Sequence, residues 1–285
     1  MFSLNCKGKL LVIDKPLVMG IINITPDSFY KGSSQQTNAS VLAQATKIIN
    51  EGAGIIDVGG QSTRPGSERI SIKEELQRVL PAIEIILKNF SETIISVDTY
   101  QSKVAEECVN AGAAIINDIS AGNMDSAMLS TVAKLQVPYI CMHMKGTPED
   151  MQQHPTYENV TMEVLYFFIQ KVDECRRSGI NDVIIDPGFG FGKTIAHNFT
   201  LLKELSAFKM LDKPIIAGLS RKSTIYKTLG VTAEEALNGT TVLNTLALQN
   251  GANILRVHDV KEAKEVVTLW ERYIQPLKSP RRETC

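Results

Sequence analysis

Eight short apolar runs, spaced along the whole chain, constrain the fold of this protein more than any other feature of its sequence. Each run is rich in Ile and Val, is followed by a polar turn, and leads into a longer stretch with helical spacing. The runs cover residues 17–23, 54–59, 94–98, 114–119, 138–142, 182–186, 214–218 and 253–258. Their apolar residues are nearly continuous instead of alternating, a pattern typical of parallel strands that are buried on both faces.

The intervening segments show the apolar periodicity of amphipathic helices. Between residues 73 and 88, one face of the predicted helix consists of Leu76, Val79, Leu80, Ile83, Ile86 and Leu87. Pro81 lies within this segment and predicts a kink or a late helix start, because proline lacks the N–H that a helix interior needs. The last predicted helix repeats the pattern at Ala263, Val266, Val267, Trp270 and Ile274.

Eight strands that alternate with helices predict an α/β fold, and a closed (β/α)8 TIM barrel more than an open doubly wound sheet, which remains the alternative. The 285 residues suit one such barrel, and no linker or low-complexity tract divides them. We therefore expect residues 1–285 to form a single domain. Residues 1–16 carry Gly8 between two short apolar stretches and predict a β-hairpin over the bottom of the barrel.

Composition excludes several classes of function. The 30 basic and 31 acidic residues give a net charge of −1, which argues against a broad nucleic-acid or anionic membrane surface. No apolar stretch reaches the roughly 18 residues of a membrane helix, and residues 1–16 lack a signal-peptide block. The five cysteines form no CxxC pair and are expected to be reduced thiols of a cytoplasmic protein; the role of Cys285 is undetermined.

Polar side chains occur at or near the end of every predicted strand. They are Asn23, Asp57, Asp98, Asn117, Asp118, His143, Asp186, the segment 220–223, Arg256 and His258. Each one alone is equally well explained as a helix cap or turn former. In a barrel, however, the carboxyl ends of all strands face one mouth, where active sites lie. Carboxylates and amides gathered there suit a planar heterocycle with several hydrogen-bond donors and acceptors.

A second predicted cluster is cationic. Lys222, Arg256, His258 and Arg64 follow strands at the same mouth, and residues 220–223 are expected to begin a helix whose free N–H groups attract an anion. A capped helix with solvated basic residues is the alternative. The long polar loops 25–38 and 59–70 are candidate lids.

Other catalytic templates are absent or weak. Residues 188–193, GFGFGK, lack the full spacing of a phosphate-binding loop, and the sequence has no GxGxxG, GxSxG or HExxH motif. The four histidines are scattered, so a transition metal held by protein ligands alone is not expected. Magnesium that enters with a phosphate ligand is compatible, because it keeps several waters.

The strand-end motifs resemble those of the dihydropteroate synthase family over nearly the whole chain. In order, they are MGIINITPDSF (19–29), GGQSTRPG (59–66), SVDT (96–99), INDI (116–119), MH (142–143), DPGFGFGK (186–193), GLSRKS (218–223) and RVHD (256–259). Individually some are short, but together and in this order they are specific. The resemblance implies a pterin-binding barrel and a transferase that joins 6-hydroxymethyl-7,8-dihydropterin pyrophosphate to 4-aminobenzoate with release of pyrophosphate.

The resemblance also implies roles for individual residues and an assembly state. The pterin site would contain Asp98, Asn117, Asp186, Lys222 and Arg256. Of these, the catalytic residues would be Asp98, Asp186, Lys222 and Arg256. Asn23, Arg256 and His258 would bind pyrophosphate, with Asn23 as a ligand of the cofactor Mg²⁺. The aminobenzoate site would contain Phe29, Thr63, Arg64, Pro65, Phe191 and Ser223. A homodimer through the later barrel helices is also implied. If this reaction occurs, positive charge can develop on the electron-rich dihydropterin as pyrophosphate leaves, and we therefore expect an SN1-like mechanism.

The chain departs from the family pattern in the two predicted mobile loops. Lys31 replaces an acidic residue, Ser33 and Ser34 lie where glycines are usual, and Gln61 replaces a glutamate. These changes put the loop geometry and the response to sulfonamides in doubt more than substrate identity. Two alternatives follow: a methyltetrahydrofolate methyltransferase with a corrinoid partner, and a catalytically silent pterin-binding paralogue.

Overall fold

Eight parallel strands form the centre of the molecule in a computed structural model that describes residues 1–25, 34–62, 67–151 and 155–274. The strands are β3 (Leu17–Asn23), β4 (Ile55–Gly59), β5 (Ile94–Asp98), β6 (Ile115–Asp118), β7 (Tyr139–Met142), β8 (Val183–Asp186), β9 (Ile216–Ala217) and β10 (Ile254–Val257). Their hydrogen-bonded order is β8-β7-β6-β5-β4-β3-β10-β9. One parallel bridge between Ile185 and Ile215 connects the two edges. The sheet is therefore a nearly closed barrel, which confirms the predicted fold and excludes the doubly wound sheet.

The predicted strand positions are confirmed with small changes of length. Two runs, 17–23 and 94–98, match β3 and β5 at both ends. The run 214–218 shortens most, because only Ile216 and Ala217 pair with β10.

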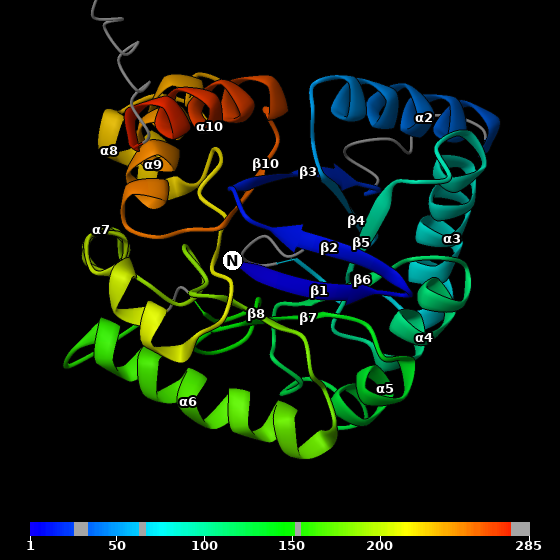
Figure 1. The fold of residues 1–285 in the computed structure, drawn as a ribbon, viewed down its shortest axis with the longest axis horizontal. Coiled ribbons are helices and arrows are strands. Elements are labelled where there is room, and N and C mark those ends of the chain that lie inside the picture. Colours follow the sequence, from blue (N-terminus) through cyan, green and yellow to red (C-terminus); the bar gives the residue numbers. More distant parts are fainter. Residues whose placement is uncertain (26–33, 63–66, 152–154, 275–285) are drawn as a thin grey trace, which may run out of the picture.

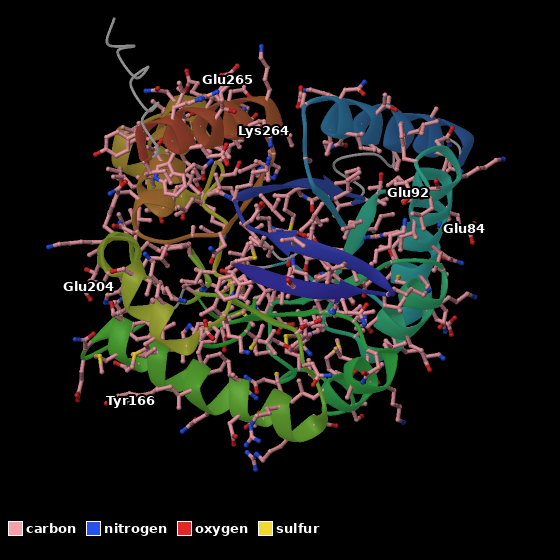
Figure 2. All side chains as sticks on the ribbon, viewed as in Figure 1. Glu84, Glu92, Tyr166, Glu204, Lys264 and Glu265 are labelled. Atoms are coloured by element: carbon pink, nitrogen blue, oxygen red, sulfur yellow. The ribbon has the colours of Figure 1, made fainter. Side chains whose placement is uncertain are left out.

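Helices follow the strands and surround the barrel (Figure 1). They are α2 (Ser34–Asn50), α3 (Ile72–Asn89), α4 (Ser102–Asn110), α5 (Met128–Leu135), α6 (Val160–Ser178), α7 (Ile195–Lys203), the 3₁₀ helix η1 (Leu205–Leu211), α8 (Ser223–Leu229), α9 (Leu237–Gln249) and α10 (Val260–Ile274). Charged side chains such as Glu84 and Glu265 point outward from this layer (Figure 2). No helix of the described residues is long and apolar enough to span a membrane.

Helix α3 shows how local sequence fixes an element. The Ser71 side chain accepts a hydrogen bond from the Glu74 N–H and caps the first turn. Val79, Ile83 and other predicted apolar residues are buried against the barrel. The helix begins nine residues before Pro81 and continues beyond it, so the predicted late start is wrong. The cap and the apolar face outweigh the one backbone hydrogen bond that proline removes.

A hairpin of β1 (Phe2–Cys6) and β2 (Lys9–Ile13) lies across the bottom of the barrel, as predicted (Figure 1). Lys7 and Gly8 have φ values of 54° and 87°, which suit a tight two-residue hairpin turn. The buried face of the hairpin packs on the amino-terminal layer inside the barrel. This cluster contains Leu4, Cys6, Leu11, Ile13, Met19, Ile55, Ala114, Ile115, Ile140, Ile184, Ile216 and Ile254. The bottom of the barrel is thus filled with apolar side chains.

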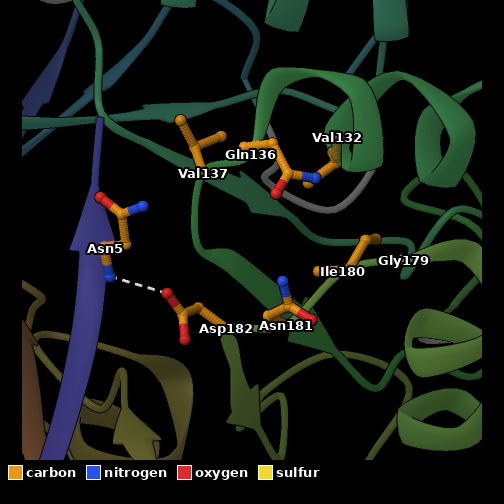
Figure 3. A pocket seen from close by; sticks show the side chains of 8 residues that line it. All are labelled: Asn5, Val132, Gln136, Val137, Gly179, Ile180, Asn181 and Asp182. Atoms are coloured by element: carbon orange, nitrogen blue, oxygen red, sulfur yellow. Dashed lines mark hydrogen bonds between the residues drawn. The ribbon is translucent and has the colours of Figure 1, made fainter. Parts of the chain in front are cut away.

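A cavity of about 190 Å³ lies at this same bottom end (Figure 3). It lies between β1, the end of α5 and the segment before β8, and Asp182 accepts a hydrogen bond there from the Asn5 N–H at 2.7 Å. The polar strand ends predicted as the site are at the opposite end of the barrel. The cavity is therefore separate from the candidate active site.

Adjacent residues of each strand face opposite sides of the sheet, which the nearly continuous apolar runs conceal. In β6, Asn117 contacts groups inside the barrel, whereas Asp118 bonds to Tyr139 on the side that faces the helices. Inside the barrel, the apolar bottom layer gives way to Asp57, Asp98 and Asn117 above it. The polar layer lies at the carboxyl ends of the strands.

Candidate active site

The floor of the mouth is a buried network centred on Arg256. Its Nη2 lies 2.6 Å from Oδ2 of Asp57 and 2.6 Å from Oδ2 of Asp98, and its Nε donates to Asp57 at 2.7 Å. The Asn117 side-chain amide donates to Asp57 at 3.1 Å. The structure thus brings together Asp98, Asn117 and Arg256, three of the predicted pterin residues, from β5, β6 and β10.

Asp57 connects the residues of this floor, a role that was not predicted from the sequence. It is fully buried on β4 and links Arg256 to Asn117. Its Oδ1 atom is buried without a partner among the described groups. The available signal was a carboxylate inside an otherwise apolar run, two positions before the strand end, which places it on the inner face.

Burial and nearby charges oppose each other at Asp98. Loss of water raises the pKa of this carboxyl to about 7, with Arg256 lowering it and Asp57 raising it. Burial acts to lower the pKa of Arg256, but the two carboxylates raise it overall, so the guanidinium stays charged. The floor therefore holds one fixed cation and one carboxyl that titrates near neutral pH.

A second part of the site joins the end of β8 to the segment after β9. Asp186 Oδ1 accepts a hydrogen bond from the Gly188 N–H at 2.8 Å. Lys222 Nζ donates to the Phe189 carbonyl at 2.6 Å and lies 4.8 Å from the centre of the Phe191 ring. Burial lowers the pKa of Lys222 to about 8, opposed by Asp186.

Gly218 leaves space between the two parts of the site. A Cβ atom at this position would lie 3.6 Å from Lys222 Nζ and 4.0 Å from Arg256 Cβ. The two predicted pterin-binding cations therefore flank a position without a side chain. This arrangement suits a flat ligand that contacts Lys222 and Arg256 together.

Asn23 and His258 lie at the upper edge of the floor. His258 Nδ1 is 3.0 Å from Ser220 Oγ, and the residue is otherwise exposed at the mouth. Desolvation of the ring and the Arg256 cation lower the pKa of His258 to about 4. A Cβ atom at Gly59 would lie 3.4 Å from Asp98 Cβ and 3.6 Å from Asn23 Oδ1, so Asn23 is next to the floor.

The segment after β9 is held in an unusual backbone conformation. Arg221 has a φ of 55°, and its guanidinium binds Asp259 at 2.8 Å and the carbonyls of Ala233 and Glu234. These contacts fix the turn that carries Lys222. Ser223 begins α8, as predicted, and no side chain caps this helix.

Four of the predicted aminobenzoate residues lie in segments outside the described part of the chain. They are Thr63, Arg64, Pro65 and Phe29. The departures Lys31 and Ser33 and the terminal Cys285 are also outside it.

Gln61, the other departure from the family pattern, is described and buried. Its amide donates to the carbonyls of Ser62 at 2.7 Å and Glu68 at 2.9 Å, and its oxygen accepts from the Ile70 N–H at 2.9 Å. A glutamate has no N–H groups for the two carbonyls. The substitution therefore changes how the two ends of this loop are held together.

Two polar strand-end residues do not join the floor. Asp118 faces the helices, where Tyr139, Ser120 and Gly122 donate to it. His143 packs edge-on against Phe167, and its Nδ1 lies 2.9 Å from Lys193 Nζ. The expectation that all strand-end polar groups enter one mouth is wrong for these two, because adjacent strand residues face opposite ways and His143 lies past the end of β7.

The donor set near the floor fits a magnesium ion that a pyrophosphate brings with it. Asn23 offers a hard amide oxygen at the mouth, the kind of ligand that Mg²⁺ accepts. Within the part of the chain that the structure describes, no group of three or more His, Cys, Asp or Glu side chains forms a metal cage. Such an ion would keep most of its ligands from phosphate and water.

Comparison with known proteins identifies a matching family and similar relatives. Residues 19–258 match the family model described as "Pterin binding enzyme". A dihydropteroate synthase of Escherichia coli K12 is 42% identical over 283 residues, which are 99% of this chain and 100% of the relative.

Two solved structures from Xanthomonas albilineans are also similar. A dihydropteroate synthase with 4-aminobenzoic acid has a TM-score of 0.90 and 39% identity, and covers 97% of this chain and 99% of its own. A complex with 7,8-dihydropteroate has a TM-score of 0.84 and 35% identity, with the same coverage of both chains.

Proposed function

This chain belongs to the dihydropteroate synthase family of pterin-binding enzymes, and we propose that it joins 6-hydroxymethyl-7,8-dihydropterin pyrophosphate to 4-aminobenzoate by an SN1-like route. The bond between the pterin methylene carbon and the pyrophosphate oxygen breaks first. The aminobenzoate nitrogen then bonds to that carbon and loses a proton, which gives 7,8-dihydropteroate. The observation that carries the proposal is the buried Asp57–Arg256–Asp98 network beside Asp186 and Lys222.

The electrostatics of the floor support a cationic intermediate. Positive charge develops on the dihydropterin ring as pyrophosphate leaves, and the carboxylates of Asp98 and Asp186 are fixed in place to stabilise it. Their action needs no reorganisation of solvent, because both groups are buried. The aromatic amine is already nucleophilic, so no strong general base is required.

The rim of the site supports binding of the leaving group. Asn23 and His258, with Arg256 below them, are the residues we assign to pyrophosphate. Asn23 would hold Mg²⁺ at this rim, and the ion would supply charge that stabilises the departing anion. Ser223 and Phe191 are the described residues that we assign to 4-aminobenzoate.

Pyrophosphate release tests the proposed reaction directly. We expect purified protein with the pterin pyrophosphate and Mg²⁺ to release pyrophosphate much faster when 4-aminobenzoate is added, with dihydropteroate as the product. In its absence, slow release with formation of hydroxymethyl-dihydropterin would support the SN1-like route, because water then captures the cation. Tight pterin binding without turnover would instead identify a silent paralogue. Methyl transfer from methyltetrahydrofolate to a corrinoid protein would identify the methyltransferase alternative.

We also infer a homodimer in the cytoplasm. Leu229 of α8 and Val242 and Leu246 of α9 are 56%, 50% and 44% exposed, an apolar surface on the later helices that a second copy would cover. Light scattering of the purified protein tests this assembly. The cysteines Cys6, Cys108, Cys141 and Cys175 are free and buried, in keeping with a reducing compartment.

A further inference from the structure

Lys193 is a buried cation that the proposed mechanism does not use. It ends the glycine-rich segment after β8, and only 2% of the residue is exposed. Its Nζ donates to the carbonyls of Gly188 at 2.9 Å, Phe191 at 3.0 Å and His143 at 3.3 Å. The Nδ1 atom of His143 lies 2.9 Å away. Four acceptors thus surround one amine.

This set of partners favours the charged form of Lys193. An ammonium group has three N–H donors, whereas a neutral amine has two for the same four acceptors. Burial lowers the pKa of Lys193 to about 7, with Asp186 raising it and Lys222 lowering it. Burial, and then the Lys193 charge, lower the pKa of His143 to about 2, so its ring is neutral. The ammonium donor assigns the lone pair to Nδ1 and the proton to Nε2.

Two other side chains also contact the segment that Lys193 closes: Asn198 Oδ1 accepts a hydrogen bond from the Gly190 N–H at 2.7 Å, and Tyr157 Oη donates to the Gly192 carbonyl at 2.8 Å. Gly188, Gly190 and Gly192 have φ values of 69°, 83° and 61°, a region that favours glycine. A Cβ atom at Gly188 would lie 1.9 Å from the His143 carbonyl oxygen, and one at Gly192 would lie 2.2 Å from that of Lys145. The backbone of the segment therefore packs directly on the backbone after β7. The ammonium joins the two backbones at this contact.

The same segment contacts the candidate active site. Its Phe189 carbonyl accepts the hydrogen bond from Lys222, and its Phe191 ring lies beneath the Lys222 ammonium. Its Gly188 N–H donates to Asp186. A change in the path of residues 188–192 therefore moves the hydrogen-bond partners of Asp186 and Lys222, which we assign to the pterin. It also moves Phe191, which we assign to aminobenzoate.

We propose that Lys193 is a positioning residue, whose ammonium group holds residues 188–192 in the conformation that presents Phe191 and orients Lys222. Its effect on the reaction rests on the proposed function, whereas the contacts of its ammonium group with the backbone do not. The contacts of Nζ also exclude a phosphate-loop role for this lysine, because its donors are already directed at backbone carbonyls.

Lys193→Met tests the proposal, because methionine keeps an unbranched side chain of similar length without the charge. We expect the KM for 4-aminobenzoate to rise about tenfold or more, since Phe191 loses its support. The dissociation constant of the pterin should change less, because Asp98, Asn117 and Arg256 are held by contacts outside residues 188–192. Lys203→Met, at an exposed position on α7, is the matched control and should leave both values unchanged.

Two further readouts separate positioning from simple stabilisation. The ¹⁵N shift of His143 Nδ1 should change in Lys193→Met and not in the control, because the ammonium donor is lost. This measurement needs no turnover, so it remains decisive if the synthase assay fails in the wild type. In Lys193→Ala, added methylammonium should restore part of the lost aminobenzoate affinity by occupying the vacated position.

A folded Lys193→Met protein with unchanged KM and an unchanged His143 shift would overturn the proposal. So would equal losses in every kinetic parameter with no response to methylammonium. If Lys193→Met does not fold, Lys193→Gln keeps two N–H donors and gives the same tests, with a smaller expected rise in KM.

Discussion

Asp98 and Asp118 are buried carboxylates on neighbouring strands, and they differ in the number of hydrogen-bond donors that they contact. Asp118 accepts four hydrogen bonds of 2.7 Å each, from Ser120 N–H, Ser120 Oγ, Gly122 N–H and Tyr139 Oη. Asp98 contacts one donor group among the described residues, the Arg256 guanidinium at 2.6 Å. Asp118 is thus fully hydrogen-bonded, whereas Asp98 retains acceptor capacity that no described donor uses.

The difference follows from where the partners of each carboxylate lie. The donors of Asp118 come from the turn after β6 and from β7, so this carboxylate fixes the start of the loop behind the site. The carboxylate of Asp98 is held by a cation that is itself shared with Asp57. Charge held in place but incompletely paired is what electrostatic catalysis needs.

The largest effect should come from Asp98→Asn. Removing the charge opposite a developing cation should lower kcat/KM by about 100- to 1000-fold. At pH 7.5, the free energy of unfolding should change by less than about 1 kcal/mol, because Arg256 keeps Asp57 and a desolvated charge is removed. Pyrophosphate release and urea unfolding measure the two quantities. Near-normal activity in this variant would remove Asp98 from the mechanism.

Asp118→Asn should show the reverse pattern. An asparagine presents an N–H₂ group to donors that need an acceptor, so we expect a loss of about 3 kcal/mol in the free energy of unfolding. Tyr139→Phe removes one of the four donors and should cost about 1 kcal/mol. Activity per folded molecule should remain within a few-fold of wild type in both. A catalytic defect as large as that of Asp98→Asn would abolish the distinction between the two carboxylates.

The smallest effect should be a pH dependence confined to Asp98. Its pKa is raised to about 7 by burial, so between about pH 4 and pH 7 the folded protein keeps a proton that the unfolded chain has released. The stability that this proton contributes is present at low pH and is lost as the pH rises to 7. Asp98→Asn has no such proton.

The stability of Asp98→Asn relative to wild type should therefore increase from pH 5 to pH 7.5, by at most about 1.4 kcal/mol per pH unit. Urea unfolding at a series of pH values measures this difference. A constant difference would show that the carboxyl keeps its ordinary pKa in the folded protein.

The sequence predicted the barrel well, because strand burial on both faces leaves a clear record in runs such as 17–23 and 94–98. However, a continuous apolar run does not show which side of the sheet each side chain faces. Nothing in the run IIND distinguishes Asn117, which enters the floor, from Asp118, which does not. That distinction depends on which face of β6 meets the interior, and so on the pairing of the whole sheet.

The site was predicted in part for a related reason. Motif resemblance predicted Asp98, Asn117, Asp186, Lys222 and Arg256 as pterin-binding residues, and the structure gathers them at one end of the barrel. Asp57 and Lys193 were missed because each acts through its neighbours. In the sequence, Lys193 was compared with the lysine of a phosphate-binding loop, because it follows a glycine-rich segment. Its partners in the structure are backbone carbonyls, which no sequence motif reveals.

The order of strands in the barrel has a consequence for synthesis of the chain. β3, near the start, pairs with β4 on one side and with β10, near the end, on the other. At roughly 5–20 residues per second, the ribosome takes tens of seconds to deliver β10 after β3 has emerged. During that interval one edge of β3 is open, and the hairpin of β1 and β2 has no complete barrel to cover. The open edge of β3 therefore has to be protected until β10 has been synthesised.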